Sequence, residues 1–201
     1  MTLPDSARVE VTDSFFPSAR GLNGNGDSLA ATFIWNSFDT TIIEVLDSTT
    51  GVALGKTVGT GRLQARTGEL RSNPQQVQVI ARLDSMAPVS PPVDTLDTSP
   101  TDSTGDSLSN PIKIQTFAFG GNALSRRVVY RMTVYPATGP VVTLVPNDTV
   151  ATLADGTASV QVKVSLGAPL PDSVVVTATM QRFHGGPLPG SPVPFVVRVV
   201  P

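Results

Sequence analysis

The chain has 201 residues, of which 15% are charged, and a formal net charge of −2. It contains no cysteine and one histidine, His184, which together exclude a disulfide framework, a thiolate nucleophile, an iron–sulfur cluster and a two-histidine metal site within one chain. It also lacks the basic excess that is typical of nucleic-acid-binding proteins. Its many valines and threonines favour β structure.

The sequence shows no targeting or membrane-spanning segment. The first 30 residues lack both a basic start and an apolar run of signal-peptide length. No stretch reaches the roughly 18 apolar residues that a membrane-spanning helix needs. We therefore expect a protein that is not integral to a membrane.

Short strands with an alternating pattern are expected in the N-terminal half. In Gln75–Ile80, valines alternate with glutamines, which is typical of a strand with one buried face. Residues 21–27 and 47–51 predict turns, because glycine and asparagine tolerate a positive φ. The other expected strands are Arg8–Thr12, Ala30–Trp35, Ile42–Leu46 and Arg62–Thr67.

Residues 85–111 differ in composition from the segments on either side. They are rich in Pro, Ser, Thr and Asp, and such a segment buries too little apolar surface to fold alone. Pro91-Pro92 favours extended backbone. The segment has no Lys or Arg and carries four aspartates, Asp94, Asp97, Asp102 and Asp106. We therefore predict a domain at 1–84, an acidic linker at 85–111 and a domain at 112–201.

The alternation continues in the C-terminal half and is clearest in Ala158–Leu166, where valines at 160, 162 and 164 share one face. Turn signals recur every 8–12 residues, which is the spacing of a β-sandwich. The sequence therefore predicts an all-β protein with two tandem sandwiches. The other expected strands of this half are Lys113–Phe119, Arg127–Tyr135, Val141–Val145, Ser173–Gln181 and Pro194–Val200.

A family resemblance is carried in the N-terminal half by Trp35-Asn-Ser-Phe-Asp39, Ile43-Glu-Val45, Thr50-Gly51 and Gly59-Thr-Gly-Arg-Leu-Gln-Ala65. In order and spacing these residues resemble bacterial Ig-like domains of the group-2 type, over about residues 8–82. The family's opening strand and its glycine-containing turn are short or are replaced by Phe15-Phe16-Pro17. The resemblance implies that Trp35 anchors the core of the first sandwich; the alternative role for a lone tryptophan is a sugar-stacking platform.

Three segments of the C-terminal half resemble invasin-type or related bacterial Ig-like modules. They are Asp155-Gly-Thr-Ala-Ser-Val160, Pro171-Asp-Ser-Val-Val-Val-Thr-Ala178 and Gly190-Ser-Pro-Val-Pro-Phe195. The two resemblances imply tandem Ig-like sandwiches from bacterial envelope proteins. Such modules space, adhere or bind partners and are typically not enzymes.

Motifs that carry catalysis are absent from the sequence. There is no Gly-x-Ser-x-Gly elbow, no His-Glu-x-x-His and no phosphate-binding loop. His184 lies between two expected strands, where an exposed loop residue is favoured over a general base. Asp102-Ser-Thr-Gly-Asp106 has oxygen ligands for calcium but no EF-hand pattern, which favours a solvated linker. We expect no enzyme activity, no metal and no cofactor.

Two groups of residues are the candidates for binding partners, together with the four aspartates of the linker. The first group is Arg126, Arg127 and Arg131. On a strand, Arg127 and Arg131 share one face and Arg126 points away. Such a cluster suits acidic protein surfaces or anionic lipid headgroups. The second group is Arg182, Phe183 and His184, on a loop tip of the kind at which sandwiches commonly bind.

The linker is acidic and the C-terminal half is basic, and this favours a structural subunit over an enzyme. We expect a non-enzymatic, membrane-extrinsic protein that clamps or spaces other protein subunits of a larger bacterial envelope assembly, such as a photosynthetic or respiratory complex. The alternative is a cell-surface adhesin or a carbohydrate-binding fragment. Both place the chain in the cell envelope, on the periplasmic or extracellular side, and neither involves nucleic acid.

Overall fold

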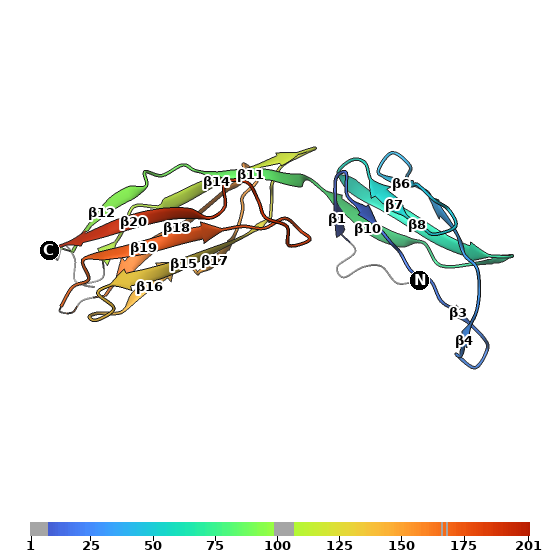
Figure 1. The fold of residues 1–201 in the computed structure, drawn as a ribbon, viewed down its shortest axis with the longest axis horizontal. Coiled ribbons are helices and arrows are strands. Elements are labelled where there is room, and N and C mark those ends of the chain that lie inside the picture. Colours follow the sequence, from blue (N-terminus) through green and yellow to red (C-terminus); the bar gives the residue numbers. More distant parts are fainter. Residues whose placement is uncertain (1–7, 99–106, 166, 168) are drawn as a thin grey trace. The chain divides into compact units, whose positions relative to one another are not determined.

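The computed structural model describes residues 8–98, 107–165, 167 and 169–201. Every regular element in these ranges is a strand, which confirms the all-β prediction (Figure 1). The chain divides into two compact units. Unit 1 comprises Met1–Arg82 with Phe119–Gly121, and unit 2 comprises Leu83–Ala118 with Asn122–Pro201. No helix in the described ranges is long and apolar enough to cross a membrane.

Unit 1 is built from two small sheets and a separate hairpin. The first sheet has the order β1-β10-β8-β5, with β9 paired to β8, and the second has the order β2-β7-β6. Strand β1 runs parallel to β10, and the other pairs in these sheets are antiparallel. The strands of the two sheets are β1 (Arg8–Glu10), β2 (Ser14–Phe15), β5 (Ile34–Ser37), β6 (Ile43–Val45), β7 (Ala53–Gly55), β8 (Gly59–Thr67), β9 (Leu70–Arg71) and β10 (Gln75–Ile80).

Alternate side chains of the two sheets form the core of unit 1. Val77 and Val79 of β10 are fully buried, as their alternation with glutamines predicts. They pack with Phe15 and Ile43 from the second sheet. Trp35 is also buried, and its indole ring lies against Gly51 so closely that a Cβ there would come within 2.8 Å of the ring nitrogen. The structure thus supports the core position of Trp35 that the family resemblance implies.

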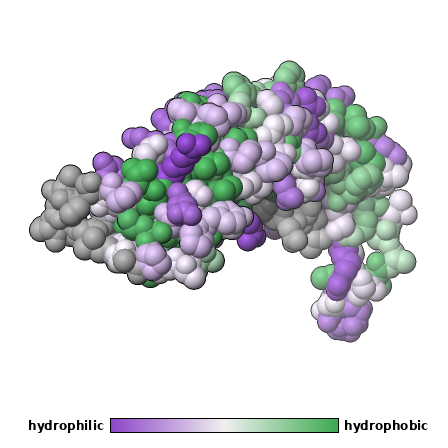
Figure 2. All heavy atoms as spheres, turned by 60° about the vertical axis from the view of Figure 1, so that its left-hand side comes forward, coloured by the Kyte–Doolittle hydropathy of each residue, from purple (hydrophilic) through white to green (hydrophobic). Residues whose placement is uncertain are grey.

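The hairpin of unit 1 projects from the rest of that unit as an arm (Figures 1 and 2). It consists of β3 (Gly21–Leu22) and β4 (Ser28–Leu29). The turn between them is held by Asn23, whose side chain accepts the backbone N–H groups of Asn25 and Asp27, each at 2.9 Å. This confirms the turn predicted at 21–27. The strands themselves are too short to show a hydrophobic period.

Unit 2 is a sandwich of two five-stranded sheets. The first has the order β11-β14-β18-β13, with β16 also paired to β18, and the second has the order β12-β20-β19-β15-β17. These orders match the two sheets of an immunoglobulin-like fold. The strands are β11 (Arg82–Pro88), β12 (Val93–Asp97), β13 (Ser107–Leu108), β14 (Ile112–Phe119), β15 (Arg127–Tyr135), β16 (Val142–Val145), β17 (Thr149–Ala151), β18 (Thr157–Val164), β19 (Ser173–Thr179) and β20 (Val193–Val200).

The segment expected to be a linker, residues 85–111, is largely part of this sandwich. Strand β11 joins the first sheet, and β12 pairs in parallel with β20 in the second. Leu83, Met86 and Leu96 supply the buried side chains of these strands. The composition was misleading because an edge strand needs apolar residues on one face only and tolerates proline. Pro91 and Pro92 lie where the chain changes sheets.

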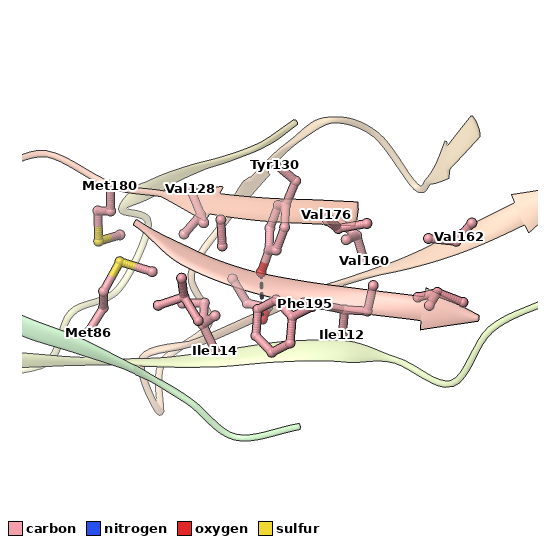
Figure 3. Packing of buried hydrophobic residues seen from close by; sticks show 14 of the residues in the cluster. Met86, Ile112, Ile114, Val128, Tyr130, Val160, Val162, Val176, Met180 and Phe195 are labelled. Carbon is pink, nitrogen blue, oxygen red and sulfur yellow. Dashed lines mark hydrogen bonds between the residues drawn. The ribbon is translucent and has the colours of Figure 1, made fainter. Parts of the chain in front are cut away.

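The core of unit 2 lies between its two sheets (Figure 3). Ile112 and Ile114 of β14 face Tyr130 of β15 and Phe195 of β20, all almost fully buried. The Tyr130 hydroxyl donates a hydrogen bond of 3.0 Å to the carbonyl oxygen of Ala158 in the opposite sheet. The two sheets are therefore joined by apolar packing and by at least one buried polar contact.

Tyr130→Phe should lower the free energy of unfolding by about 1–2 kcal/mol, because the buried carbonyl loses its partner. Burial also raises the pKa of Tyr130 above its ordinary value of 10.0. In the folded state the neutral phenol is favoured, so this stabilisation is complete below pH 10 and is lost as the pH rises further. The Tyr130→Phe variant has no phenol to ionise at this position. Its free energy of unfolding should therefore fall less than that of the parent protein as the pH rises above 10.

Chemical denaturation of both proteins between pH 7 and 11 measures this difference. Tyr135→Phe is the matched control, because Tyr135 is the other tyrosine of the chain and is 53% exposed. A Tyr130→Phe protein as stable as the parent at pH 7, with the same alkaline profile, would contradict the assignment of this hydrogen bond.

Candidate protein-binding surface

The outer face of the second sheet of unit 2 carries three exposed arginines, and we call it the arginine face. Arg127 and Arg131 alternate with buried residues along β15, so both point outward. Arg198 points outward from β20, between the buried Val197 and Val199. Arg127 and Arg131 were expected to share a face, and the structure places them on one. Arg198 was not among the predicted contact residues, although its alternation with valines marks it as outward-facing.

The strand register arranges the arginine face in rows. Tyr135, Ser173, Arg198 and Thr95 lie opposite one another in a single row across four strands. The next row contains Thr133, Val175, Val196 and Val93. At a strand spacing of about 4.8 Å, Tyr135 and Arg198 are roughly 10 Å apart. A partner that lies flat on this sheet would contact both.

The three arginines have no carboxylate partner among the residues that the structure describes. Of the acidic residues on the strands of this sheet, Asp94 faces inward and Asp97 lies at the end of β12, opposite Val200. Half-buried valine and threonine side chains, such as Val129, Val175 and Thr177, alternate with fully buried residues and so point to the same outer face. The face therefore offers guanidinium groups on a mixed apolar and hydroxyl background.

Arg126 was expected to contact a partner, but its side chain is buried. It is 8% exposed and so belongs to the interior. Its backbone N–H donates to the hydroxyl of Thr152, and its carbonyl accepts from the N–H of Thr152, both at 2.8 Å. The Thr152 hydroxyl in turn donates to the carbonyl of Ala123. Residue 126 thus holds the entry to β15 in place, and it does not form part of the arginine face.

Arg182, Phe183 and His184 lie in the connection between β19 and β20, as expected from the sequence. A bridge between Gln181 and Pro187 closes this loop, and the N–H of Arg182 donates to the carbonyl of Gly186 at 3.0 Å. The rings of Phe183 and His184 meet edge to face at a centroid distance of 5.2 Å. Phe183 and Arg182 are half-buried and only His184 is exposed, so the loop presents less aromatic surface than predicted.

The four aspartates do not form a common site in the described residues. The two carboxylate oxygens of Asp94 accept hydrogen bonds from the backbone N–H and side-chain amide of Asn110, at 3.1 and 2.9 Å. Asp97 is exposed on β12. Asp102 and Asp106, and with them the calcium alternative, lie outside the described residues. Within the described ranges no three His, Asp or Glu side chains gather as a metal site would require.

Comparisons with known proteins give remote structural similarities only. No protein-family model and no curated protein matches the chain. Domains 4 and 5 of the S-layer protein SbsC align with 17% identity and a TM-score of 0.36, over 92% of this chain and 80% of that one. The Yersinia pseudotuberculosis adhesin InvE aligns with 14% identity and a TM-score of 0.43, over 97% of this chain and 57% of that one. The D0-D1 domain of intimin aligns with 14% identity and a TM-score of 0.31, over 95% of each chain.

Arg126 is buried and the residues of the arginine face are exposed, so their substitutions should differ in their effect on stability. Thermal and chemical denaturation can measure this difference. Arg126→Ala should lower the free energy of unfolding by about 1–3 kcal/mol, because a buried side chain and its contacts are lost. Arg127→Ala and Arg131→Ala are matched controls on the same strand, and each should stay within about 0.5 kcal/mol of the parent. Equal effects at all three positions would contradict this division.

Proposed function

We propose that the chain is a non-enzymatic protein-binding module of the bacterial cell surface, and that the arginine face is its contact surface for an acidic protein partner. The observation that supports the proposal most directly is the presence of Arg127, Arg131 and Arg198 on one sheet face with no carboxylate partner in the described part of the chain. The resemblance of the sequence to bacterial Ig-like domains supports the cell-surface part.

The size of the arginine face suits a modest protein interface. Five strands at about 4.8 Å and seven residues at about 3.3 Å give an area on the order of 500 Å². The smaller specific interfaces bury up to roughly 600 Å² on each partner. Arginine and tyrosine are the residue types most often found at energetic centres of interfaces, and Tyr135 lies in the same row as Arg198.

The chemistry of the face indicates what the partner presents. A guanidinium group binds a carboxylate through two parallel hydrogen bonds, which fixes orientation as well as adding energy. The half-buried valines between the arginines add apolar contact area. The partner surface is therefore expected to carry aspartate or glutamate side chains around apolar residues. Its binding should weaken with salt, because exposed charges are screened.

The membrane-extrinsic clamp, which was the main expectation from the sequence, loses the charge contrast on which it depended. That hypothesis contrasted an acidic linker with a basic C-terminal domain. Strands β11 and β12 belong to the sandwich of unit 2, so the segment does not connect two domains as a separate charged element. The cell-surface module and the membrane-extrinsic clamp both bind a protein partner. They differ in the location of the chain and in whether it belongs to a membrane complex.

The contact surface can be tested by site-specific cross-linking in the native cells. A photoreactive phenylalanine analogue in place of Tyr135 should cross-link one acidic protein. The same analogue in place of Thr143, exposed on the first sheet, should not. Arg131→Glu should lower the cross-linking yield about tenfold, or ~1.4 kcal/mol, whereas Lys163→Glu on the first sheet should leave it unchanged. Equal labelling from both sheets would overturn the assignment of the face.

The location can be tested on intact cells. A protease added outside the cells should degrade a cell-surface protein and spare a periplasmic control protein. If the chain instead survives and migrates on a native gel with a large membrane complex at fixed stoichiometry, the membrane-extrinsic reading replaces the cell-surface one.

A further inference from the structure

Unit 2 contains a pocket at the edge of the sandwich, which shares Val196 with the arginine face. It has a volume of about 160 Å³ and lies where the chain passes from β11 to β12, beside the residues that precede β14. Ile112, Phe195 and Val197 are buried core residues that reach its wall. The remaining lining residues are Ser90, Pro91, Asp94, Asn110, Pro111 and Val196.

Hydrogen bonds hold the two walls of the pocket together at both ends. At one end, the Ser90 hydroxyl donates to the carbonyl of Pro111 at 2.6 Å and accepts the N–H of Lys113 at 2.9 Å. At the other end, Asn110 donates to both oxygens of Asp94. Prolines in both walls restrict their backbones further. The pocket is thus fixed by the folded sandwich and is not a gap between movable side chains.

Among the described residues, Asp94 is the only charged one that lines the pocket. On β12 it alternates with exposed neighbours and shares the inward-facing side of the strand with the buried Leu96. Its hydrogen-bond partner, Asn110, is uncharged, and no cation among the described residues pairs with it. The pocket therefore combines apolar walls with one carboxylate whose charge no described residue neutralises.

These features point to an occupant with an apolar stem and a positive end. An apolar cavity of about 150 Å³ accommodates benzene, so 160 Å³ is sufficient for the four-carbon stem of a lysine. Both oxygens of Asp94 already accept from Asn110, which disfavours the two-pronged binding of a guanidinium group. A compact ammonium group needs only one remaining lone pair.

We propose that this pocket binds a lysine side chain of a partner polypeptide, with the methylene stem against Phe195 and Ile112 and the ammonium group on Asp94. The inference depends on the pocket alone. Its failure would leave the arginine face untouched, and the reverse also holds.

The experiment is a titration of the full chain, labelled with ¹⁵N and followed by amide chemical shifts. The probes are N-acetyl-lysine amide, its Nε-acetylated form, which has no charge, and N-acetyl-arginine amide. The lysine probe should give saturable shifts at Asp94, Asn110 and Val197. We expect the acetylated probe to bind at least fivefold more weakly, and the arginine probe to bind more weakly than lysine.

Asp94→Asn should weaken binding of the lysine probe at least fivefold. Asp97→Asn is the matched control, because it removes the same charge from the outward side of the same strand. Equal binding of the charged and acetylated probes, an equal loss in both variants, or no saturable shift at the pocket would each overturn the proposal. If Asp94→Asn does not fold, the binding of the charged and acetylated probes to the parent protein still tests the proposal.

Discussion

The passage of the chain from one sheet to the other between Pro88 and Val93 determines much of unit 2. Because β11 joins the first sheet and β12 joins the second, one short segment closes the same edge of both layers. The prolines there have no N–H to donate, so neither sheet can continue through them. The passage between the sheets brings Ser90 and Asp94 opposite Pro111 and Asn110, and these residues form the walls of the pocket at Asp94. The binding features on this edge therefore follow from a backbone constraint.

The same segment shows where sequence reasoning succeeds and where it does not. Gln75–Ile80 and Arg127–Tyr135 were predicted with their observed bounds, because long strands with one buried face impose a clear period of two. Two-residue strands such as Ser14–Phe15 leave no period to detect. Residues 85–111 were misread because composition averages over a segment, whereas burial of β11 and β12 depends on a few correctly spaced apolar side chains.

The candidate site residues also divide into those that a local sequence pattern predicts and those that it does not. The outward position of Arg127 and Arg131 could be predicted, since alternation along one strand is a local property. The burial of Arg126 could not, because this residue precedes β15, and its backbone groups pair with Thr152, which is distant in sequence. The pocket at Asp94 could not be predicted either. Its walls come from segments about 20 residues apart, and its floor comes from β20, about 100 residues further along the chain.

Unit 2 carries arginines on an exposed sheet face and a carboxylate in the pocket at Asp94. Guanidinium groups with no carboxylate partner in the described ranges lie on an open sheet, where solvent screens them and where contact with a partner is spread over several rows. A single carboxylate lies in a restricted pocket, where contact is limited to one side chain. The charges on the arginine face favour rapid and correctly oriented association with a partner. The pocket at Asp94 favours discrimination between the side chains that a partner presents.

The parallel pairing of β12 with β20 also has a consequence for synthesis. Val93 lies opposite Val196, so the two strands are separated by about 100 residues of chain. At a translation rate of roughly 5–20 residues per second, β12 waits on the order of 5–20 s before its partner exists. During that interval its edge and the apolar side of Leu96 are uncovered. The aspartates on either side of Leu96 place charge on the strand for as long as it remains unpaired, which disfavours association with other nascent chains.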